Sequence, residues 1–206
     1  MIKKEIGMKK YFIVLFSALF SQASFAYEHH SFFSNFYHPH YGTYHYNKGG
    51  VDEAQGQYGV VFPIQQALPN PKLTPGALNS AVNQNNIDQT ICRRGGYTKS
   101  IRPNVQYTEK LKKEGIRAYG YTDYRLGDYE EDHLISLELG GSPDSPQNLW
   151  PEPHHVVGNW GSYAKDKVEN KLHAMVCHHQ ISLQQAQYMI STNWMDAYKK
   201  YIGNNP

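Results

Sequence analysis

The sequence predicts a small α+β domain in which two short strands are followed by helices. The first observation is Asp132-His133-Leu134-Ile135, which places a carboxylate and an imidazole at the edge of an apolar run and predicts a strand. The second is the connection to Leu149-Trp150. It holds Gly140-Gly141, Pro143 and Pro146, which favour turns, so the chain is expected to fold back on itself there. The third is a recurrence of apolar residues at helical spacing beyond residue 160.

Residues 67 to 206 are expected to hold this domain. The segment from Thr108 to Ile116 predicts a short helix that Gly115 closes. After Trp150 comes a predicted helix, whose apolar residues are Tyr163, Val168, Leu172 and Met175 or Val176. A second helix is predicted over Ser182 to Tyr198, because Ser182 is a good N-cap and Gln185 follows three residues later. Its predicted buried face consists of Leu183, Ala186, Met189, Ile190 and Trp194.

The N-terminal part of the chain is predicted to lie outside this domain. Four lysines precede the apolar run from Tyr11 to Phe20, and Ser24-Phe25-Ala26 supplies the small residues that a signal peptidase reads. Residues 1 to 26 are therefore predicted to be a secretory signal peptide, too short to be a stable membrane anchor. Residues 27 to 66 form a predicted His- and Tyr-rich extension. Its first part, residues 27 to 50, is too poor in aliphatic residues to build a core, whereas the apolar run from Tyr58 to Ile64 is a candidate strand. That first part is expected to be flexible or loosely docked on the domain, and weak metal capture or surface adhesion is its alternative role. We expect a secreted or periplasmic protein.

The overall charge does not by itself predict a nucleic-acid partner. Residues 1 to 26 hold four of the 20 basic and one of the 18 acidic residues, so 16 and 17 remain. A protein that holds a polyanion usually presents a basic face. Basic residues are concentrated before the predicted strands, at Arg93, Arg94, Lys99, Arg102, Lys110, Lys112, Lys113, Arg117 and Arg125. This run is either a phosphate-contacting face or an ordinary solvated surface.

Three polar side chains near the predicted turn are candidates for hydrolytic chemistry. Asp132 and Asn148 offer the hard oxygen ligands that Mg²⁺ accepts, and the turn can bring Asn148 beside Asp132 and His133. An imidazole with its ordinary pKa of about 6.5 can take a proton from an attacking water. Phosphodiester hydrolysis uses both parts, because the metal stabilises charge on the phosphate while the base makes the nucleophile.

These residues belong to three blocks that resemble the His-Asn-His (HNH) endonucleases of the ββα-metal fold. The blocks are D-H-L-I-x-L-E-L-G-G at 132 to 141, N-L-W-P-E-P at 148 to 153 and A-K-D-x-x-E at 164 to 169. The resemblance is closest to a branch of small bacterial proteins and covers about residues 67 to 198. It implies a ββα-metal (HNH-like) nuclease domain with additional helices.

The resemblance also implies a role for each candidate residue. Asp132 is expected to be a ligand of one divalent metal, most simply Mg²⁺, and His133 the general base. Asn148 is either a second ligand or the group that orients the base. Lys165 and Lys167, at the start of the following helix, either contact phosphate or form a solvated face. The motif's third position, a His or Asn on that helix, stays open among His154, His155, Asn159 and Ser162.

The sequence therefore predicts a secreted, metal-dependent endonuclease that hydrolyses phosphodiester bonds of nucleic acid, with DNA favoured and a monomer expected. The resemblance implies departure of the 3′ oxygen and a 5′-phosphate product. Nothing in the sequence resembles a separate sequence-reading module such as a zinc finger, so low sequence specificity is expected. The alternative is an exported, non-catalytic protein that binds metal or a surface polymer on the same fold.

Cys92 and Cys177 are the only two cysteines, and they are expected to form a disulfide. The predicted signal peptide sends them to an oxidising compartment. Neither has a second Cys nearby with which to form a zinc site or a C-x-x-C redox pair. The bridge is expected to close a loop that contains the whole candidate site.

Overall fold

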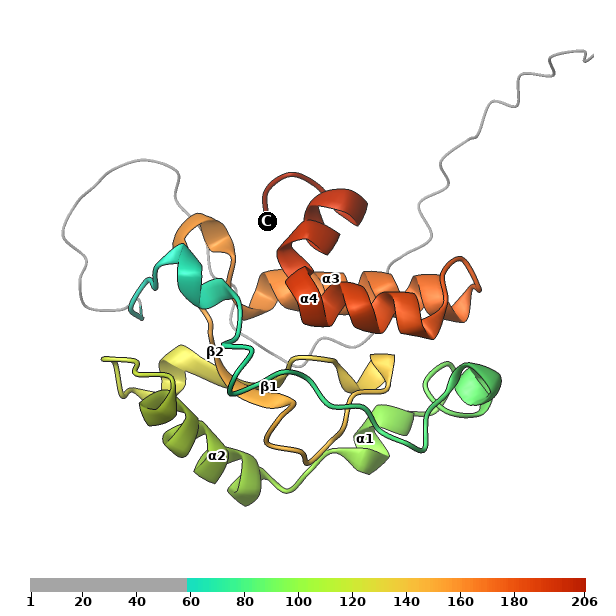
Figure 1. The fold of residues 1–206 in the computed structure, drawn as a ribbon, viewed down its shortest axis with the longest axis horizontal. Coiled ribbons are helices and arrows are strands. Elements are labelled where there is room, and N and C mark those ends of the chain that lie inside the picture. The colour runs from blue at the N-terminus through green and yellow to red at the C-terminus, as the bar shows by residue number, and fades with distance from the viewer. Residues whose placement is uncertain (1–58) are drawn as a thin grey trace, which may run out of the picture. The chain divides into compact units, whose positions relative to one another are not determined.

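The computed structural model describes residues 59 to 206, in which two strands and four α-helices form a mixed α+β fold (Figure 1). The predicted signal peptide and residues 27 to 58 of the predicted extension lie outside the described residues. The elements follow in the order α1 (Tyr97–Ile101), α2 (Val105–Ala118), β1 (Tyr129–His133), β2 (Leu149–Pro153), α3 (Ser162–Cys177) and α4 (Leu183–Tyr201). The predicted α+β class is thus confirmed.

The two strands form an antiparallel pair that lies between helices. Figure 1 shows α2 on one side of the pair and α3 with α4 on the other. Glu130 lies opposite Glu152 and Asp132 opposite Trp150. Because side chains alternate along a strand, Glu130, Asp132 and Glu152 share one face of the pair. That face meets α3, where Lys165 bonds to Asp132.

The helix predicted over residues 108 to 116 is longer in the structure, and Gly115 does not close it. Asn104 caps α2 by accepting a hydrogen bond from the backbone N–H of Gln106, and the helix continues to Ala118. Gly115 lies inside α2 where the helix crosses β2. A Cβ atom built there would come within 2.8 Å of the Pro151 ring. The glycine is therefore needed for close helix–strand contact, which its position in the sequence does not reveal.

We expect Gly115→Ala to destabilise the domain by about 1 to 3 kcal/mol, because the rigid Pro151 ring cannot move aside without shifting β2. In a free helix the same change would stabilise by about 1 kcal/mol. Denaturant unfolding of the variant tests this, with Lys113→Ala on the exposed face of α2 as the control. A Gly115→Ala variant more stable than the parent would show that α2 and β2 are not packed as described.

The two C-terminal helices follow the predicted patterns with two differences. Ser182 and Gln185 form the predicted capping box at the start of α4. Of the residues assigned to the buried faces, Tyr163 is exposed and Met189 is only partly buried. Of the alternatives Met175 and Val176, Val176 is the buried one, and the remaining residues are in the core. Helix α4 is also interrupted at Asn193, whose side chain accepts hydrogen bonds from the backbone N–H groups of Met195 and Asp196 and so starts its last segment.

The folded unit includes residues before position 67, where the sequence places the domain boundary. The side chain of Phe62 is 4% exposed and packs on Tyr129 with ring centroids 5.0 Å apart. Its backbone bonds to His155 and Val157. The end of the predicted extension nearest the domain is thus part of the core. Among residues 59 to 206, no helix has the length and apolar character needed to cross a membrane.

Candidate active site on the strand pair

His133 is the last residue of β1, and a hydrogen bond determines which of its ring nitrogens carries a proton. Its Nε2 lies 2.8 Å from the carbonyl oxygen of Pro143 in the turn-rich connection. A carbonyl only accepts hydrogen bonds, so Nε2 carries the proton and Nδ1 keeps its lone pair. The residue is 8% exposed, and burial lowers the pKa of the imidazole. A neutral imidazole with an available Nδ1 is the form that a general base requires.

Asn148 is fully buried and holds the connection between the strands in place. Its Oδ1 accepts hydrogen bonds from the backbone N–H groups of Ile135 at 3.0 Å and Ala77 at 3.4 Å. Its Nδ2 donates to the carbonyls of Ile135 and Ser142, both at 3.0 Å. Both lone pairs of Oδ1 and both N–H groups are therefore used, which argues against the metal-ligand role proposed for Asn148 from the sequence. The other alternative fits better, because Asn148 orders the loop that carries Pro143.

We expect Asn148→Ala to lower the free energy of unfolding by about 2 to 4 kcal/mol, because it leaves several buried backbone groups of the loop without partners. Denaturant unfolding measures the loss. Asn170→Ala is the matched control, since Asn170 is exposed and makes one bond to the Asp166 carbonyl. A loss below about 1 kcal/mol would remove Asn148 as the organiser of the loop.

Asp132 meets α3 through a buried ion-pair cluster. The ammonium of Lys165 donates to Asp132 Oδ2 at 2.5 Å and to the His133 carbonyl at 2.9 Å, and it also pairs with Glu169. Lys165 is 1% exposed, so it is neither the phosphate-contacting residue nor part of the solvated face that the sequence suggests. Burial alone would lower the pKa of Lys165, but the carboxylates of Asp132, Glu169 and Glu152 outweigh it and raise that pKa. Lys165 is therefore charged.

Glu152 adds a second buried acid to the same face. It is 1% exposed, and neither of its carboxylate oxygens has a hydrogen-bond donor among the described residues. Burial, together with the nearby Asp132 carboxylate, raises the pKa of Glu152 well above its ordinary value. Burial and Asp132 likewise raise the pKa of Glu130, to about 7. The face thus carries more acid than Lys165 can neutralise, and it holds either protons or an additional cation.

None of the four candidates for the third motif position has a described bond to Asp132. His154 Nδ1 bonds to Ser162 Oγ at 2.8 Å, and its ring stacks on Tyr163. His155 and Asn159 are exposed. The helix residue that contacts Asp132 is instead Lys165. Lys165 also pairs with Glu169, which lies four positions further along the same side of α3. The spacing of Lys165 and Glu169 was readable in the sequence, whereas the face on which Glu152 lies depends on the register of the strand pair.

The basic run before β1 is only partly available for phosphate. Lys112 is buried and donates to the carbonyls of Leu126 and Tyr129, and Arg125 pairs with Asp123 and Asp128. Arg102 is exposed. Burial raises the pKa of Glu130 and Asp166, and the Arg102 charge offsets a small part of that rise. Arg102 thus lies within electrostatic reach of the acids of the candidate site.

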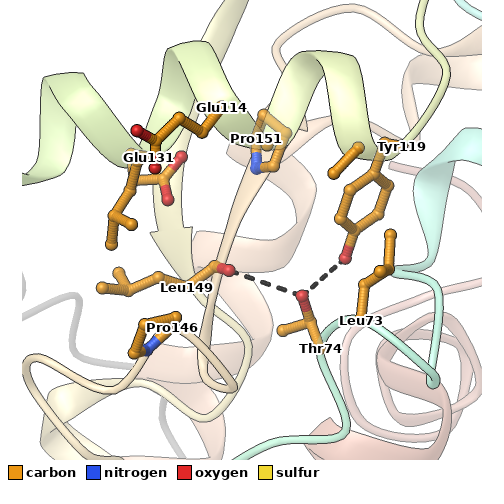
Figure 2. A pocket seen from close by; sticks show the side chains of 11 residues that line it. Leu73, Thr74, Glu114, Tyr119, Glu131, Pro146, Leu149 and Pro151 are labelled. Atoms are coloured by element: carbon orange, nitrogen blue, oxygen red, sulfur yellow. Dashed lines mark hydrogen bonds between the residues drawn. The ribbon is translucent and has the colours of Figure 1, made fainter.

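A cavity of about 190 Å³ lies where α2 meets the strand pair, and Figure 2 shows Glu131 and Glu114 at one end with Thr74 and Tyr119 at the other. Tyr119 donates to Thr74 Oγ1 at 2.6 Å. Glu131 Oε2 is buried and has no hydrogen-bond partner among the described residues. Burial, followed by the Asp132 charge, raises the pKa of Glu131 to about 8. Glu131 therefore enters the cavity as a neutral carboxyl group at pH 7.

This shift predicts a pH dependence of stability that Glu131→Gln removes. The pKa is about 8 in the folded state and near 4.5 when unfolded. Between these values the folded state binds more protons, so the free energy of unfolding falls as the pH rises. Gln does not titrate. We expect the stabilisation of Glu131→Gln relative to the parent to be larger at pH 8.5 than at pH 4.5 by at least about 2 kcal/mol. Denaturant unfolding at both pH values measures this, with exposed Glu114→Gln as control; equal gains for both variants would contradict it.

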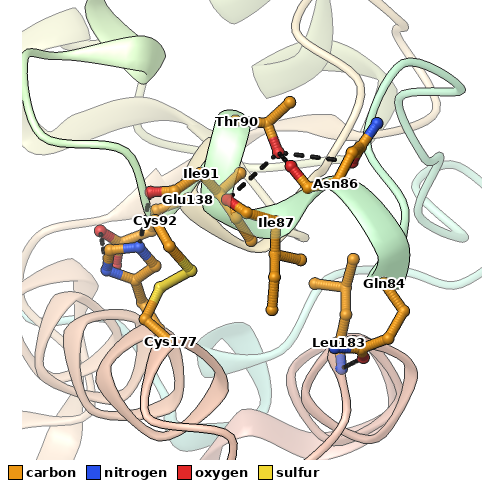
Figure 3. Close-up of a disulfide and its surroundings, with 10 residues drawn as sticks. Gln84, Asn86, Ile87, Thr90, Ile91, Cys92, Glu138, Cys177 and Leu183 are labelled. Atoms are coloured by element: carbon orange, nitrogen blue, oxygen red, sulfur yellow. Dashed lines mark hydrogen bonds and ion pairs between the residues drawn. A yellow bond between two sulfur atoms is a disulfide. The ribbon is translucent and has the colours of Figure 1, made fainter.

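The predicted disulfide between Cys92 and Cys177 is present, with the two Cα atoms 5.4 Å apart (Figure 3). His173 lies beside it, and its ligand nitrogen and the two sulfurs fall within 4.8 Å of one another. Three such donors are a possible metal site, but the metal-binding form of cysteine is the thiolate. In the disulfide form both sulfurs are bonded to each other. His173 meanwhile bonds to the Ile91 carbonyl at 2.9 Å and faces Glu138 at 3.5 Å.

No protein-family model, no curated protein and no solved structure matches the chain. The proposed function therefore rests on the residues of this chain and their geometry.

Proposed function

We propose that this protein is a metal-dependent endonuclease of the HNH type that hydrolyses phosphodiester bonds, with DNA the favoured substrate. The observation that carries the proposal is the state of His133. Its Nε2–H is committed to Pro143, its Nδ1 is an acceptor, and its pKa is lowered by burial. These properties suit a group that removes a proton from water beside a carboxylate that can hold a metal. The order β1, β2, α3 agrees with the ββα arrangement that the sequence resemblance implies.

The acidic face of the strand pair, which carries Asp132 and Glu152, fits a hard divalent cation such as Mg²⁺ together with Glu169 of α3. Asp132, Glu152 and Glu169 carry carboxyl groups, and the His133 carbonyl lies beside Asp132 and Glu169 on the Lys165 ammonium. Within residues 59 to 206 the Glu152 oxygens have no nitrogen donor, and its carboxyl group lies against that of Asp132. Oxygen donors of these kinds are the ligands that Mg²⁺ takes in proteins. When bound, the metal supplies charge stabilisation for the scissile phosphate and the departing 3′ oxygen. Asp132 would hold it, whereas the four bonds of Asn148 to the backbone speak against a ligand role for that residue.

The chain's own residues have three tasks in this mechanism. His133 Nδ1 takes the proton from the attacking water, and the imidazolium that forms keeps its Nε2–H on the Pro143 carbonyl. Asn148 holds the loop that carries this carbonyl, so the ring cannot rotate away. Arg102 is exposed and its charge acts on His133, so it is a candidate to contact the substrate phosphate. Export of the protein, proposed from the N-terminal sequence, agrees with the disulfide.

Plasmid nicking by the purified full chain, with Mg²⁺ or with EDTA, tests the proposal. We expect nicked and linear products with Mg²⁺ and none with EDTA. Single-stranded DNA and RNA tested in parallel establish the substrate range. Absence of cleavage of all three substrates with Mg²⁺, Mn²⁺ and Zn²⁺ would favour the alternative, an exported metal- or polymer-binding protein.

A further inference from the structure

The ammonium group of Lys165 is surrounded by the kinds of oxygen that ligate a divalent cation. It bonds to Asp132 Oδ2 at 2.5 Å and to the His133 carbonyl at 2.9 Å, and it pairs with Glu169. An ammonium has three donors, and these three acceptors use all of them. Mg²⁺ and Mn²⁺ take two carboxylates and a carbonyl in the same way. The group thus occupies a position suited to a metal ion.

A second observation is a buried acid on the same face, Glu152, to which the Lys165 ammonium does not bond. Glu152 is 1% exposed, and both its oxygens lack donors among residues 59 to 206. It also lies directly opposite Glu130, another carboxyl on the same face. A buried ionised carboxylate without a partner is costly, so Glu152 either keeps a proton or faces a cation. One ammonium in place of a divalent ion leaves this deficit.

We propose that Lys165 is an internal competitor for the metal: its ammonium holds the position between Asp132 and Glu169 that a divalent cation takes, and metal binding displaces it. This proposal rests on the proposed function, since it concerns the metal of the same site. It assigns Lys165 a regulatory role, in which the folded protein stays intact without metal and binds metal only when the ion outcompetes the lysine. Weak metal affinity in the wild-type protein follows directly.

The decisive variant is Lys165→Met, which keeps the length of the side chain and removes its charge. Without the competing charge, the affinity for Mn²⁺ is expected to rise by about tenfold or more, since a positive charge a few ångströms away opposes a divalent ion strongly. Isothermal titration calorimetry of the full chain with Mn²⁺ measures this. Lys171→Met is the matched control, because Lys171 is an exposed lysine on the same helix and its affinity change should be negligible. An unchanged or weaker affinity in Lys165→Met would overturn the proposal.

Removing Lys165 leaves buried carboxylates unpaired, so the experiment also covers a variant that folds only with Mn²⁺. Circular dichroism with and without Mn²⁺ reports this: restoration of folding by Mn²⁺ supports the proposal, and failure of Mn²⁺ to restore an unfolded variant overturns it. The wild-type protein gives an independent readout. Lys165 should resist acylation by an amine-reactive ester in the absence of metal, and Mn²⁺ should increase its labelling several-fold by mass spectrometry. Saturating Mn²⁺ with unchanged protection of Lys165 would contradict displacement.

The outcomes separate this proposal from the proposed function. Tighter Mn²⁺ binding by Lys165→Met without cleavage of any nucleic acid would uphold the competition and reject the nuclease. Cleavage by the wild-type protein, with no gain in Mn²⁺ affinity in Lys165→Met, would uphold the nuclease and reject the competition. Lys165 would then be assigned to the positioning of Asp132.

Discussion

His133→Ala should lower the rate of plasmid cleavage by about 10²- to 10⁴-fold, the usual contribution of a general base. The physical reason is that His133 Nδ1 is the proposed proton acceptor, whereas the neighbouring Lys165 is charged and Asp132 is tied to it. Initial rates of nicking at saturating Mg²⁺ measure the loss. Because the proposal gives the His133 imidazole no ligand role and alanine keeps the backbone carbonyl, calorimetric affinity for Mn²⁺ should change little.

Two controls make this result specific. His178→Ala removes an exposed imidazole just beyond α3 and should leave cleavage unchanged. Far-ultraviolet circular dichroism shows whether His133→Ala remains folded after losing its bond to Pro143. A folded His133→Ala variant that keeps more than a few per cent of the parent rate would move the role of the base to another residue.

Replacing both cysteines, as Cys92→Ala/Cys177→Ala, should destabilise the protein by up to about 4 to 5 kcal/mol and lower its Tm markedly. The bridge closes a loop of 85 residues, and chain-entropy reasoning for a loop of that length gives this figure. Figure 3 shows that it joins the segment after Ile87 and Thr90 to the end of α3. Since α3 carries Lys165 and Glu169 in its first two turns, cleavage should fall at the temperatures where the variant begins to unfold.

Thermal unfolding with and without a reducing agent provides the matching control, because the reductant should lower the Tm of the parent and leave the double variant unaffected. Mass spectrometry of the non-reduced parent should show no free thiol. A loss of less than about 1 kcal/mol in the double variant would mean that packing of Ile87 and Ile91 holds this segment without the bridge.

The sequence alone determined those features that depend on neighbours along the chain. The capping box of Ser182 and Gln185 is a local arrangement, so α4 could be located to within a residue at its start. The turn residues between 140 and 146 required the chain to reverse, and the strands on either side pair as that reversal demands. The disulfide was predictable because only two cysteines exist.

Only the tertiary structure decided the roles that depend on residues distant in sequence. In the sequence, the amide of Asn148 could equally be a metal ligand or a structural group. Its role in ordering the loop follows from four hydrogen bonds to backbone groups that the fold brings around it. Lys165 reads as a solvated lysine at a helix start. It is buried because the strand pair brings Asp132 against α3 from 33 positions away. In the sequence Gly115 indicates a helix end. The structure shows that the position needs a glycine because α2 packs closely on Pro151 there. Burial and pairing across the fold set the charge and the available atoms of each group, and these are the properties that sequence spacing does not contain.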